Sequence, residues 1–576
     1  MESVFSVAVL FIGLETSCHP TNAVEIVLVN RCLNKIFLKV INSDTATKSD
    51  QSISENAKNI KRWLDSISIA EKEELDDLVC AFFYRTAIPF HVVESYSFQN
   101  LVAKLRPSYK NHLPNRKALS GRFLDSFYNK YRTIAKDMIE KSLYYCITTD
   151  GWSNLRNEHL VNFTIHIPQK KPLFWKSLDT SGVEQTGENI ADEIIKVANE
   201  LGVKKLVAVV TDNTSNMKKS WKIIEEIYPK VFANGCGAHV MNLLIKDICE
   251  LEIVSNLLQK SLSVVKFIRN NQSVLHEFNT VRHGLKIGCS LIIPVCTRWY
   301  SQYNFLKNLY QNKSTITLLM SDDSNALKKM KKQKLDSIIQ ILQQIDLWKQ
   351  VKEVCEILKY PSNLIGKLEN DSTTLDEVYS AFSSLKSYYE LCNCLNLVGK
   401  NTLLNIVENR WKFIHTQSLD FSYVLKPGNS YGNGIINGNL LQTINQLKEF
   451  IKRFFETEDE VKQCCKELND YLSQFGFMQI DEQREYNEMS PLCYWSIYGR
   501  AKFPLLFKVA LPLYCIPTSS AASERVWKVF SFVHSNRRNR LQNEKVEKLA
   551  FVYANSALLD NEDNFDYIDI EDETSE

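Results

Sequence analysis

The sequence predicts an α/β protein whose mixed sheet is joined to a long, purely helical region. Between residues 142 and 250, short apolar segments rich in β-branched residues alternate with amphipathic helical patterns. From residue 251 to residue 490 the apolar residues recur only at helical spacing. A length of 576 residues, with 44% hydrophobic and 24% charged residues, is typical of two to four globular domains.

Bulk composition excludes several classes of protein. The net charge of +2 means that any nucleic-acid surface must be a local patch. No apolar stretch reaches the roughly 18 uncharged residues of a membrane span. The 15 Cys are scattered, which predicts reduced thiols in the cytosol or nucleus. The apolar segment 4–14 resembles a signal sequence, but only Glu2 and no Lys or Arg precedes it, so we expect no secretion signal.

The N-terminal part of the chain is predicted to be helical beyond an unassigned start. Residues 1–54 carry no motif and end in a polar linker, whereas residues 55–141 have a helical pattern. One helix begins near Glu71, with acids in its first turn, and ends before Pro89. The stretch 100–123 has six cations and no Asp or Glu, which is typical either of phosphate contact or of a solvated basic loop. These cations are Lys104, Arg106, Lys110, Arg116, Lys117 and Arg122.

Two acidic residues follow predicted strands of the sheet. The apolar segment 143–147 precedes Thr148-Thr149-Asp150-Gly151-Trp152-Ser153, and a second apolar segment, 205–210, leads to Asp212. Because α/β sheets build their sites at strand ends, we expect Asp150 and Asp212 to lie side by side. Two carboxylates in that place would suit Mg²⁺, which prefers oxygen ligands. For each Asp the alternative is an ordinary helix cap.

The order of the predicted elements indicates a particular sheet. Strands at 159–167 and 174–180 follow the first strand, and a helix at 187–202 precedes the strand that leads to the second acid. The resulting order is β-β-β-α-β-α, with an acid after the first and fourth strands. This order matches a ribonuclease H-like sheet, in which those two strands are neighbours.

Cys236 and His239 are spaced like half of a zinc site in the segment that follows. A tetrahedral site needs two further ligands, and none stands at a recognisable spacing. We therefore expect no zinc, and we favour a positioning role for Cys236 and His239 beside the carboxylates.

The region 251–490 is predicted to be a bundle of long helices. Residues 427–439 are rich in Gly and Asn and predict a flexible loop, and the Lys-rich run 328–334 is either a solvated face or a DNA contact. Two apolar stripes indicate core-facing helices. The first contains Leu335, Ile338, Leu342, Ile345, Trp348, Val351, Cys355 and Leu358, and the second contains Leu440, Ile444, Leu447, Ile451 and Phe454.

Arg298 and Trp299 form a distinct feature within this helical region. An Arg beside a Trp can hold a phosphate and stack on a base. The alternative is a core Trp that is capped by an Arg, and composition alone favours it.

The C-terminal part is predicted to begin a helix behind several capping hydroxyls. This helix opens within 517–527 and contains Glu524. A basic turn at 536–541 and a last amphipathic helix follow. The acidic tail, which we place at 557–576, is predicted to be disordered.

Together these motifs resemble the hAT superfamily of DNA transposases. The resemblance covers residues 56 to 555 approximately, and the motifs stand in the order of that family. The segments that carry it are Thr149-Asp150-Gly151-Trp152-Ser153, Val210-Thr211-Asp212-Asn213-Thr214-Ser215-Asn216-Met217, Cys236-Gly237-Ala238-His239, Thr297-Arg298-Trp299 and Ser520-Ala521-Ala522-Ser523-Glu524-Arg525-Val526. The segments 88–94 and 114–117 also resemble the helical DNA-binding region of the family.

The resemblance implies a ribonuclease H-like catalytic core that is interrupted by a large helical insertion. Asp150, Asp212 and Glu524 would be the catalytic triad and would bind Mg²⁺ or Mn²⁺. Trp299 would stack where a base leaves the duplex during hairpin formation. Further DNA contacts would come from Arg298, Lys104, Arg106, Lys110, Arg116 and Lys117.

The expected domains follow from these assignments. They are an unassigned segment (1–54), a helical DNA-binding region (55–141), the first part of the ribonuclease H-like core (142–250), a helical insertion (251–490), a region that completes the core and dimerises (491–556), and the acidic tail (557–576).

The expected function is that of a nuclear hAT-type transposase or a protein derived from one. It would bind double-stranded DNA at transposon ends and at the target, as a dimer or larger homo-oligomer. It would cleave DNA and transfer strands through the Asp/Asp/Glu triad. The alternative is a domesticated, catalytically silent dimer that binds DNA or chromatin as a regulator. Family members often begin with a zinc finger that needs paired Cys and His, and Cys18, Cys32 and Cys80 show no such pairing.

Overall fold

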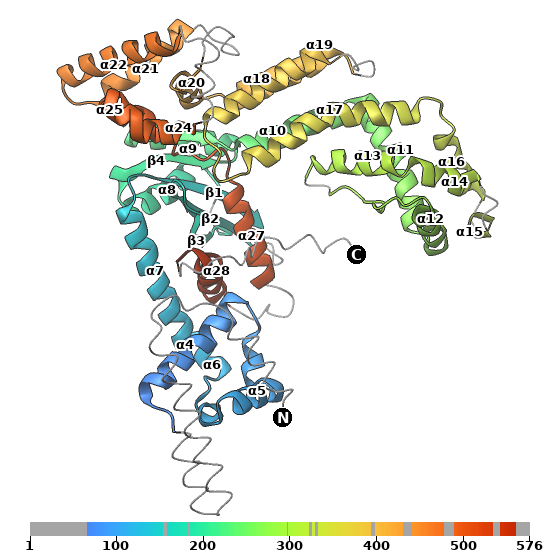
Figure 1. Cartoon of the computed structure of the whole chain (residues 1–576), viewed down its shortest axis with the longest axis horizontal. Coiled ribbons are helices and arrows are strands. Elements are labelled where there is room, and N and C mark those ends of the chain that lie inside the picture. Colours follow the sequence, from blue (N-terminus) through green and yellow to red (C-terminus); the bar gives the residue numbers. More distant parts are fainter. Residues whose placement is uncertain are drawn as a thin grey trace, which may run out of the picture. The chain divides into compact units, whose positions relative to one another are not determined.

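The computed structural model describes residues 66–559 except for short internal gaps (Figure 1). The gaps are 154–157, 183, 296–297, 322–324, 329–331, 393–397, 430–439, 477–485, 487–488 and 534–541. The expectations for residues 1–54, for the basic turn at 536–541, for the tail beyond 559 and for most of the loop at 427–439 lie outside the described residues.

The chain divides into two compact units. Among the described residues, one contains 66–75 together with Tyr96–Leu113, and the other contains Asp76–Ser95 and the described residues of 114–559. The expected helical character of 55–141 is confirmed over its described part. Its α-helices are α4 (Ile69–Arg85), α5 (Tyr96–Leu105), α6 (Arg116–Ala118) and α7 (Leu124–Lys141), and shorter helical turns η1 (Phe90–Glu94), η2 (Pro107–His112) and η3 (Leu119–Phe123) connect them.

A small mixed sheet of five strands lies in the second unit; the sequence predicts a mixed sheet and four of these strands, but not β5. The strand order is β3-β2-β1-β4-β5. Strand β1 pairs antiparallel with β2 and parallel with β4, while β2–β3 is antiparallel and β4–β5 is parallel. The two strands that carry the predicted acids are therefore neighbours. The strands are β1 (Tyr145–Ser153), β2 (His159–His166), β3 (Leu173–Asp179), β4 (Leu206–Thr211) and β5 (Phe232–Gly235).

Helices cover both faces of this sheet. Helix α8 (Gly187–Leu201) connects β3 to β4, and α9 (Ser215–Ile227) connects β4 to β5. Helices α27 (Ala521–Val533) and α28 (Asn543–Leu559) come from the far end of the chain. Helix α27 contacts β1 and β2, and α28 contacts β3. Because side chains alternate along a strand, β1 presents Thr148 and Asp150 to one face and Thr149 to the other.

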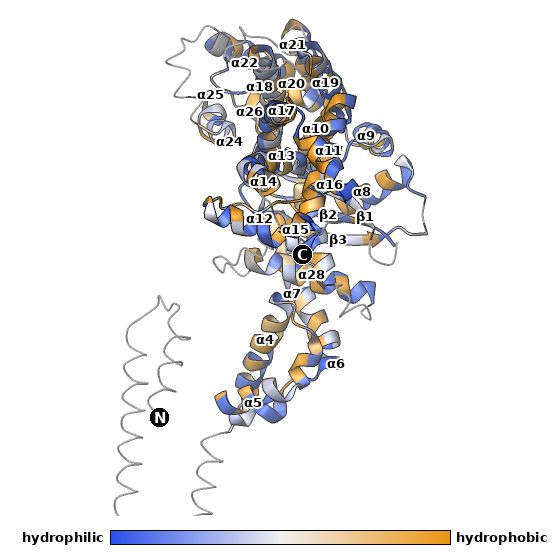
Figure 2. Ribbon diagram, turned by 90° about the vertical axis from the view of Figure 1, so that its right-hand side faces the viewer, coloured by the Kyte–Doolittle hydropathy of each residue, from blue (hydrophilic) through white to orange (hydrophobic). Residues whose placement is uncertain are grey.

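The described secondary structure elements of the insertion are helices, and most of its buried apolar residues belong to the same core as the sheet. Hydrophobic residues run along one side of many of these helices (Figure 2), and no described helix is both long and apolar enough to span a membrane. Helix α10 (Gly237–Glu250) follows β5 and precedes the insertion. The helices of the insertion are α11 (Glu252–Arg269), α12 (Gln272–Gly284), α13 (Ser301–Gln311), α14 (Lys313–Ser321), α15 (Asn325–Lys328), α16 (Lys332–Leu342), α17 (Leu347–Leu368), α18 (Asp376–Leu391), α19 (Lys400–Ile414), α20 (Gln417–Val424), α21 (Leu440–Phe454) and α22 (Glu458–Gly476). The chain then continues through α24 (Pro491–Tyr494), η6 (Trp495–Gly499), α25 (Arg500–Lys502) and α26 (Leu506–Leu513).

One predicted core stripe is partly wrong. The stripe from Leu335 to Leu358 is divided between α16 and α17, which are separated by a break between residues 342 and 347. Ile345 lies in that break and is 97% exposed. The apolar residues keep a helical spacing across this break, although the chain is not helical there. The spacing therefore wrongly predicted that Ile345 is buried in the core. Val351 and Leu358, by contrast, are fully buried on α17.

Candidate functional site

Asp150 lies inside β1 and not at its end, which corrects the sequence prediction. The parallel pairing of β1 with β4 stops at Thr148↔Val210. The antiparallel pairing with β2 continues through Asp150↔Asn162 to Ser153↔His159. The long partner strand β2 therefore keeps β1 extended beyond the point where β4 leaves it.

Asp212 directly follows β4 and is held by the turn that begins α9. The backbone N–H and the hydroxyl of Thr214 both donate to Asp212 Oδ1, at 3.0 Å and 2.9 Å. The N-cap position of α9 is Thr214 and not Asp212. Asp212 therefore supports the start of the helix from two residues before Thr214. This role is close to the helix cap that the sequence analysis gave as the alternative for this residue.

Ser523 fixes the first turn of α27 to the sheet. Its hydroxyl lies 3.0 Å from Thr148 Oγ1 and 2.7 Å from Thr164 Oγ1. The amide of Asn162 donates to the carbonyl of Ser523 at 2.7 Å. These partners are buried and come from β1 and β2, so the backbone of Glu524, the next residue, is tied to the strand pair that carries Asp150.

Electrostatics show that the three predicted acids lie near one another. Burial and then the nearby charge of Glu524 raise the pKa of Asp150 to about 7, and Asp212 adds a smaller increase. Trp527 Nε1 donates to Asp150 Oδ2 at 3.0 Å, which partly opposes the increase. Within the described ranges, however, no three His, Cys, Asp or Glu side chains are spaced to hold a metal ion.

Trp527 was not predicted as a site residue. Besides its hydrogen bond to Asp150, its ring stacks on Trp152, with centroids 5.2 Å apart. Its position three residues after Glu524 on the same helix was the available signal, because residues at this spacing share a helix face.

The raised pKa of Asp150 predicts that the stability of the metal-free protein falls with rising pH. A folded-state pKa of about 7, above the ordinary 3.8, means that the folded chain binds the proton more tightly than the unfolded chain. The free energy of unfolding should therefore fall between about pH 4 and pH 7, by at most about 4 kcal/mol, and this slope should flatten above that range. Urea unfolding in EDTA across this pH range would measure it. A slope of equal size in Asp150→Asn would assign the effect to other groups.

Cys236 and His239 lie at the start of α10, where the Cys236 side chain binds backbone N–H groups. Cys236 is the N-cap residue of this helix, and its Sγ accepts hydrogen bonds from the N–H of His239 at 3.4 Å and of Ser520 at 3.3 Å. Burial raises the pKa of the Cys236 thiol to about 11, so the thiol stays protonated at neutral pH. Cys236 thus links the start of α10 to the segment that leads into α27.

The insertion contacts the segment that carries Glu524. The Arg525 guanidinium binds both carboxylate oxygens of Asp371, at 2.5 Å and 2.7 Å. Thr518 Oγ1 donates to the carbonyl of Leu368 at 2.6 Å, and Thr374 forms an isolated bridge with Pro517. The turn after α17 therefore supports both sides of the first turn of α27.

Arg298 and Trp299 lie just before α13, whose first residue is Ser301. Trp299 is partly buried and packs against the core, as the structural alternative proposed, and it keeps a partly exposed ring. Arg298 Nη1 donates to Tyr300 Oη at 3.4 Å. Glu369, which sequence analysis missed, has a pKa raised first by burial and then by Glu524, while Arg298 opposes the increase. Arg298 is thus within electrostatic range of the acidic site.

The predicted basic surface is divided between the two compact units. Lys104, Arg106 and Lys110 belong to the first unit, and Arg116 and Lys117 belong to the second. The absence of acids from this stretch of sequence was misleading, because acids from elsewhere in the chain pair with two of these cations. Arg106 binds Glu71 at 2.9 Å, and Arg116 lies 3.5 Å from Glu94. Lys104, Lys110 and Lys117 are exposed and form no ion pair with a described acid.

The fold and the site define an α/β protein with acidic side chains on adjacent strands and a helical insertion before the third acid. Family models match three parts of the chain: a domain of unknown function (DUF659) over 114–264, a ZBED1 RNase-like helical domain over 235–357, and the hAT family C-terminal dimerisation region over 467–556. Two curated relatives from Zea mays are a putative AC transposase, 23% identical, and a putative AC9 transposase, 22% identical. Each match covers 84% of this chain and 66% of the relative.

The match to the hAT C-terminal dimerisation region and the two relatives named AC transposases support the similarity of this chain to hAT transposases. The resemblance found in the sequence is thereby confirmed. The matched dimerisation region supports a dimer or larger oligomer, in agreement with the expected C-terminal function.

Proposed function

We propose that this protein is a hAT-type transposase that cleaves and joins DNA through Asp150, Asp212 and Glu524. The observation that carries the proposal is the proximity of these three acids: burial raises the pKa of Asp150 to about 7, and the charges of Glu524 and Asp212 add to this increase. Ser523 supports it, because its hydrogen bonds bring the third acid to the sheet from a distant part of the chain. The strand order β3-β2-β1-β4-β5 and its mixed pairing support a ribonuclease H-like core.

The chemistry of the three acids fits divalent cations, although their present spacing is not that of a formed metal site. Three carboxylates that repel one another favour a cation with oxygen ligands, so Asp150, Asp212 and Glu524 would hold Mg²⁺ or Mn²⁺. Bound ions of this kind activate the attacking water or 3′-hydroxyl and stabilise the leaving oxygen.

The surrounding residues orient these acids. Trp527 holds one oxygen of Asp150, Thr214 holds one oxygen of Asp212, and Ser523 fixes the turn that carries Glu524.

We assign the DNA contacts by extension of this proposal. Lys104, Lys110 and Lys117 are exposed cations that can approach the phosphate backbone of double-stranded DNA. Arg298 and the partly exposed ring of Trp299 can hold a phosphate and stack on a base near the acids. A protein that cleaves transposon ends and joins them to target DNA would act in the nucleus, so we propose a nuclear location.

A cleavage assay tests this function and separates it from its alternative. Purified protein would be mixed with the terminal inverted repeats that flank its own gene, with Mg²⁺ or Mn²⁺ and with EDTA as the control. Nicking, hairpin formation and strand transfer only with the metal are expected. Binding of the repeats without cutting would overturn the proposal in favour of a silent dimeric regulator.

A further inference from the structure

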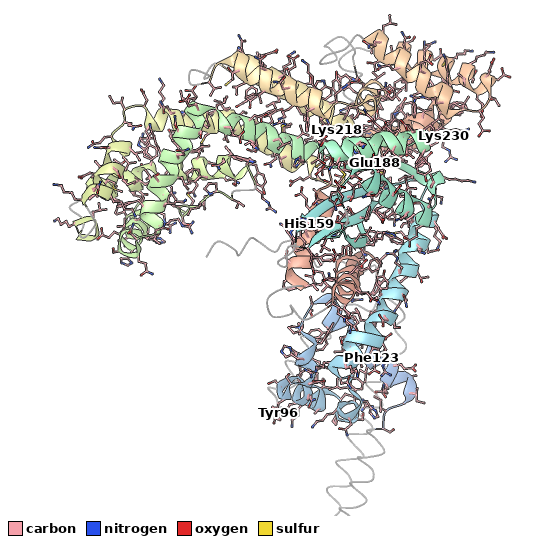
Figure 3. The ribbon with its side chains drawn as sticks, turned by 180° about the vertical axis from the view of Figure 1, so that it is seen from behind. Tyr96, Phe123, His159, Glu188, Lys218 and Lys230 are labelled. Carbon is pink, nitrogen blue, oxygen red and sulfur yellow. The ribbon has the colours of Figure 1, made fainter. Side chains whose placement is uncertain are left out.

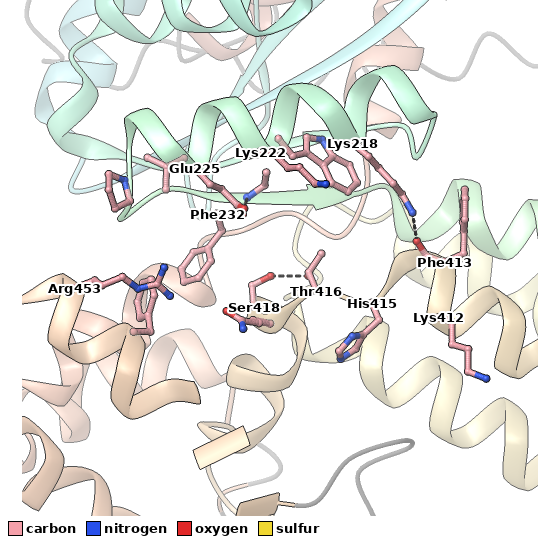
Figure 4. A pocket seen from close by; sticks show the side chains of 16 residues that line it. Lys218, Lys222, Glu225, Phe232, Lys412, Phe413, His415, Thr416, Ser418 and Arg453 are labelled. Atoms are coloured by element: carbon pink, nitrogen blue, oxygen red, sulfur yellow. Dashed lines mark hydrogen bonds between the residues drawn. The ribbon is translucent and has the colours of Figure 1, made fainter. Parts of the chain in front are cut away.

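We propose that a cation-lined cavity between α9 and the α19–α20 junction binds a nucleotide, a function beyond the proposed strand cleavage. The cavity measures about 360 Å³ and is also bordered by β5 and α21 (Figure 4). This volume falls within the range of pockets that hold small ligands. All of its lining residues belong to the second compact unit.

Positive charge dominates the wall of this cavity. Its four Lys and Arg residues are Lys218, Lys222, Lys412 and Arg453, and its one acid is Glu225. Lys412 is neutralised by Glu408 at 2.7 Å. The other three cations form no ion pair with any acid that the structure describes. The cavity therefore has an excess of positive charge that an anion would balance.

Lys218 is the most deeply placed of these cations. Its Nζ donates to the carbonyl of Phe413 at 2.5 Å and lies 3.9 Å from the centroid of the Phe413 ring (Figure 4). Both partners are uncharged, and burial lowers the pKa of Lys218. An ammonium that has lost water without gaining a counter-ion is stabilised by an incoming anion.

The start of α20 adds amide donors on the opposite side of the cavity. Thr416 is its N-cap residue but makes no side-chain cap, because its hydroxyl donates to Asn234 Oδ1 at 2.8 Å. The first-turn residues Gln417 and Ser418 line the cavity. Uncapped amides at a helix N-terminus favour phosphate, especially together with Lys and Arg side chains.

Aromatic rings favour a nucleotide over a simple acidic ligand. Trp221, Phe232, Phe413 and Phe450 line the cavity beside the cations. Phe232 and Phe450 stack on each other and, like Trp221, are largely buried, whereas Phe413 is partly exposed, and a base can stack on such a ring. Trp221 Nε1 also donates to Thr211 Oγ1 at 3.1 Å, and Thr211 immediately precedes Asp212. A ligand against Trp221 would therefore lie one hydrogen bond from the strand end that carries the second acid.

A phosphate beside a base can come from a free nucleotide or from an unpaired nucleotide of a DNA strand. The test measures binding of deoxyadenosine monophosphate by calorimetry and of a short single-stranded oligonucleotide by anisotropy. Full-length protein would be used in EDTA, so that no cleavage contributes. Binding of the mononucleotide would identify the free source, and binding of the oligonucleotide alone would identify the strand.

Two double variants with the same charge change separate the cavity from general electrostatics. Lys222→Gln with Arg453→Gln removes cavity cations from α9 and α21. Lys219→Gln with Lys452→Gln removes cations from the same helices that are paired outside the cavity, with Glu188 at 2.5 Å and Glu449 at 2.6 Å. Figure 3 marks Glu188 and the cavity residue Lys218.

We expect the cavity variant to weaken binding of the probe at least about tenfold and the control variant less than about twofold. Equal weakening in both variants, or no saturable binding of either probe by the wild type, would overturn the proposal. Asp150→Asn should bind the probe with the affinity of wild type. Probe binding would therefore stand even if the proposed DNA cleavage were disproved.

Discussion

The Asp150→Asn variant is expected to lose strand cleavage by at least about 10²–10³-fold while it still binds DNA and dimerises. The substitution keeps the size of the side chain and an oxygen that can accept from Trp527, but it removes the negative charge at the centre of the acidic site. Cleavage of labelled transposon ends with Mg²⁺ measures the loss. Anisotropy and sedimentation measure DNA binding and assembly.

The same variant should be more stable than wild type at about pH 8 in EDTA. Ionised Asp150 is disfavoured in the fold by burial and by Glu524, and neutral Asn avoids that cost. We expect a gain of about 2 kcal/mol in the free energy of unfolding, below the limit of about 4 kcal/mol that the pKa sets. An inactive variant that unfolds at higher urea cannot owe its inactivity to misfolding.

Asp192→Asn is the matched control, since Asp192 is an exposed acid on α8. It should change neither cleavage nor stability appreciably. Cleavage by Asp150→Asn at the wild-type rate would remove Asp150 from the proposed triad.

The Gly235→Ala variant is expected to lose about 2–4 kcal/mol in the free energy of unfolding. A Cβ at Gly235 would lie 1.8 Å from Asn213 Oδ1 and 2.4 Å from Asn213 Cγ. Asn213 is 2% exposed and donates to the carbonyl of Cys236 at 3.3 Å, so it has little room to move. Because Asn213 follows Asp212, its displacement should also reduce cleavage.

Gly366→Ala provides the control for this substitution. Gly366 lies at an exposed position inside α17, and a Cβ there would have no neighbour within 4 Å. Ala should stabilise this helix by about 0.5–1 kcal/mol. Urea unfolding of both variants measures the difference, and a Gly235→Ala midpoint equal to that of wild type would contradict the tight packing around Asn213.

Local pattern predicted most of the sheet, but not its exact extent. Apolar runs located β1 to β4, whereas β5 has only four residues and gave too short a signal. The extension of β1 through Asp150 depends on pairing with β2, a contact that β1 alone does not encode.

Long-range contacts account for what the sequence left undetermined at the site. The family motifs nominated Glu524, but no spacing rule places it beside Asp150, because Ser523 makes that placement through Thr148 and Thr164. In the same way, Arg106 appeared free in the sequence, and only the fold shows its pairing with Glu71.

The contacts between the insertion and α27 limit how this protein can be divided. Leu368 is the last residue of α17 and Asp371 lies in the turn between α17 and α18, yet the Leu368 carbonyl binds Thr518 and Asp371 binds Arg525, on either side of the third acid. The insertion is therefore not a removable cassette. A shortened protein engineered without it would lose the scaffold of its third acid, so a minimal transposase of this type would have to keep α17, α18 and the turn between them.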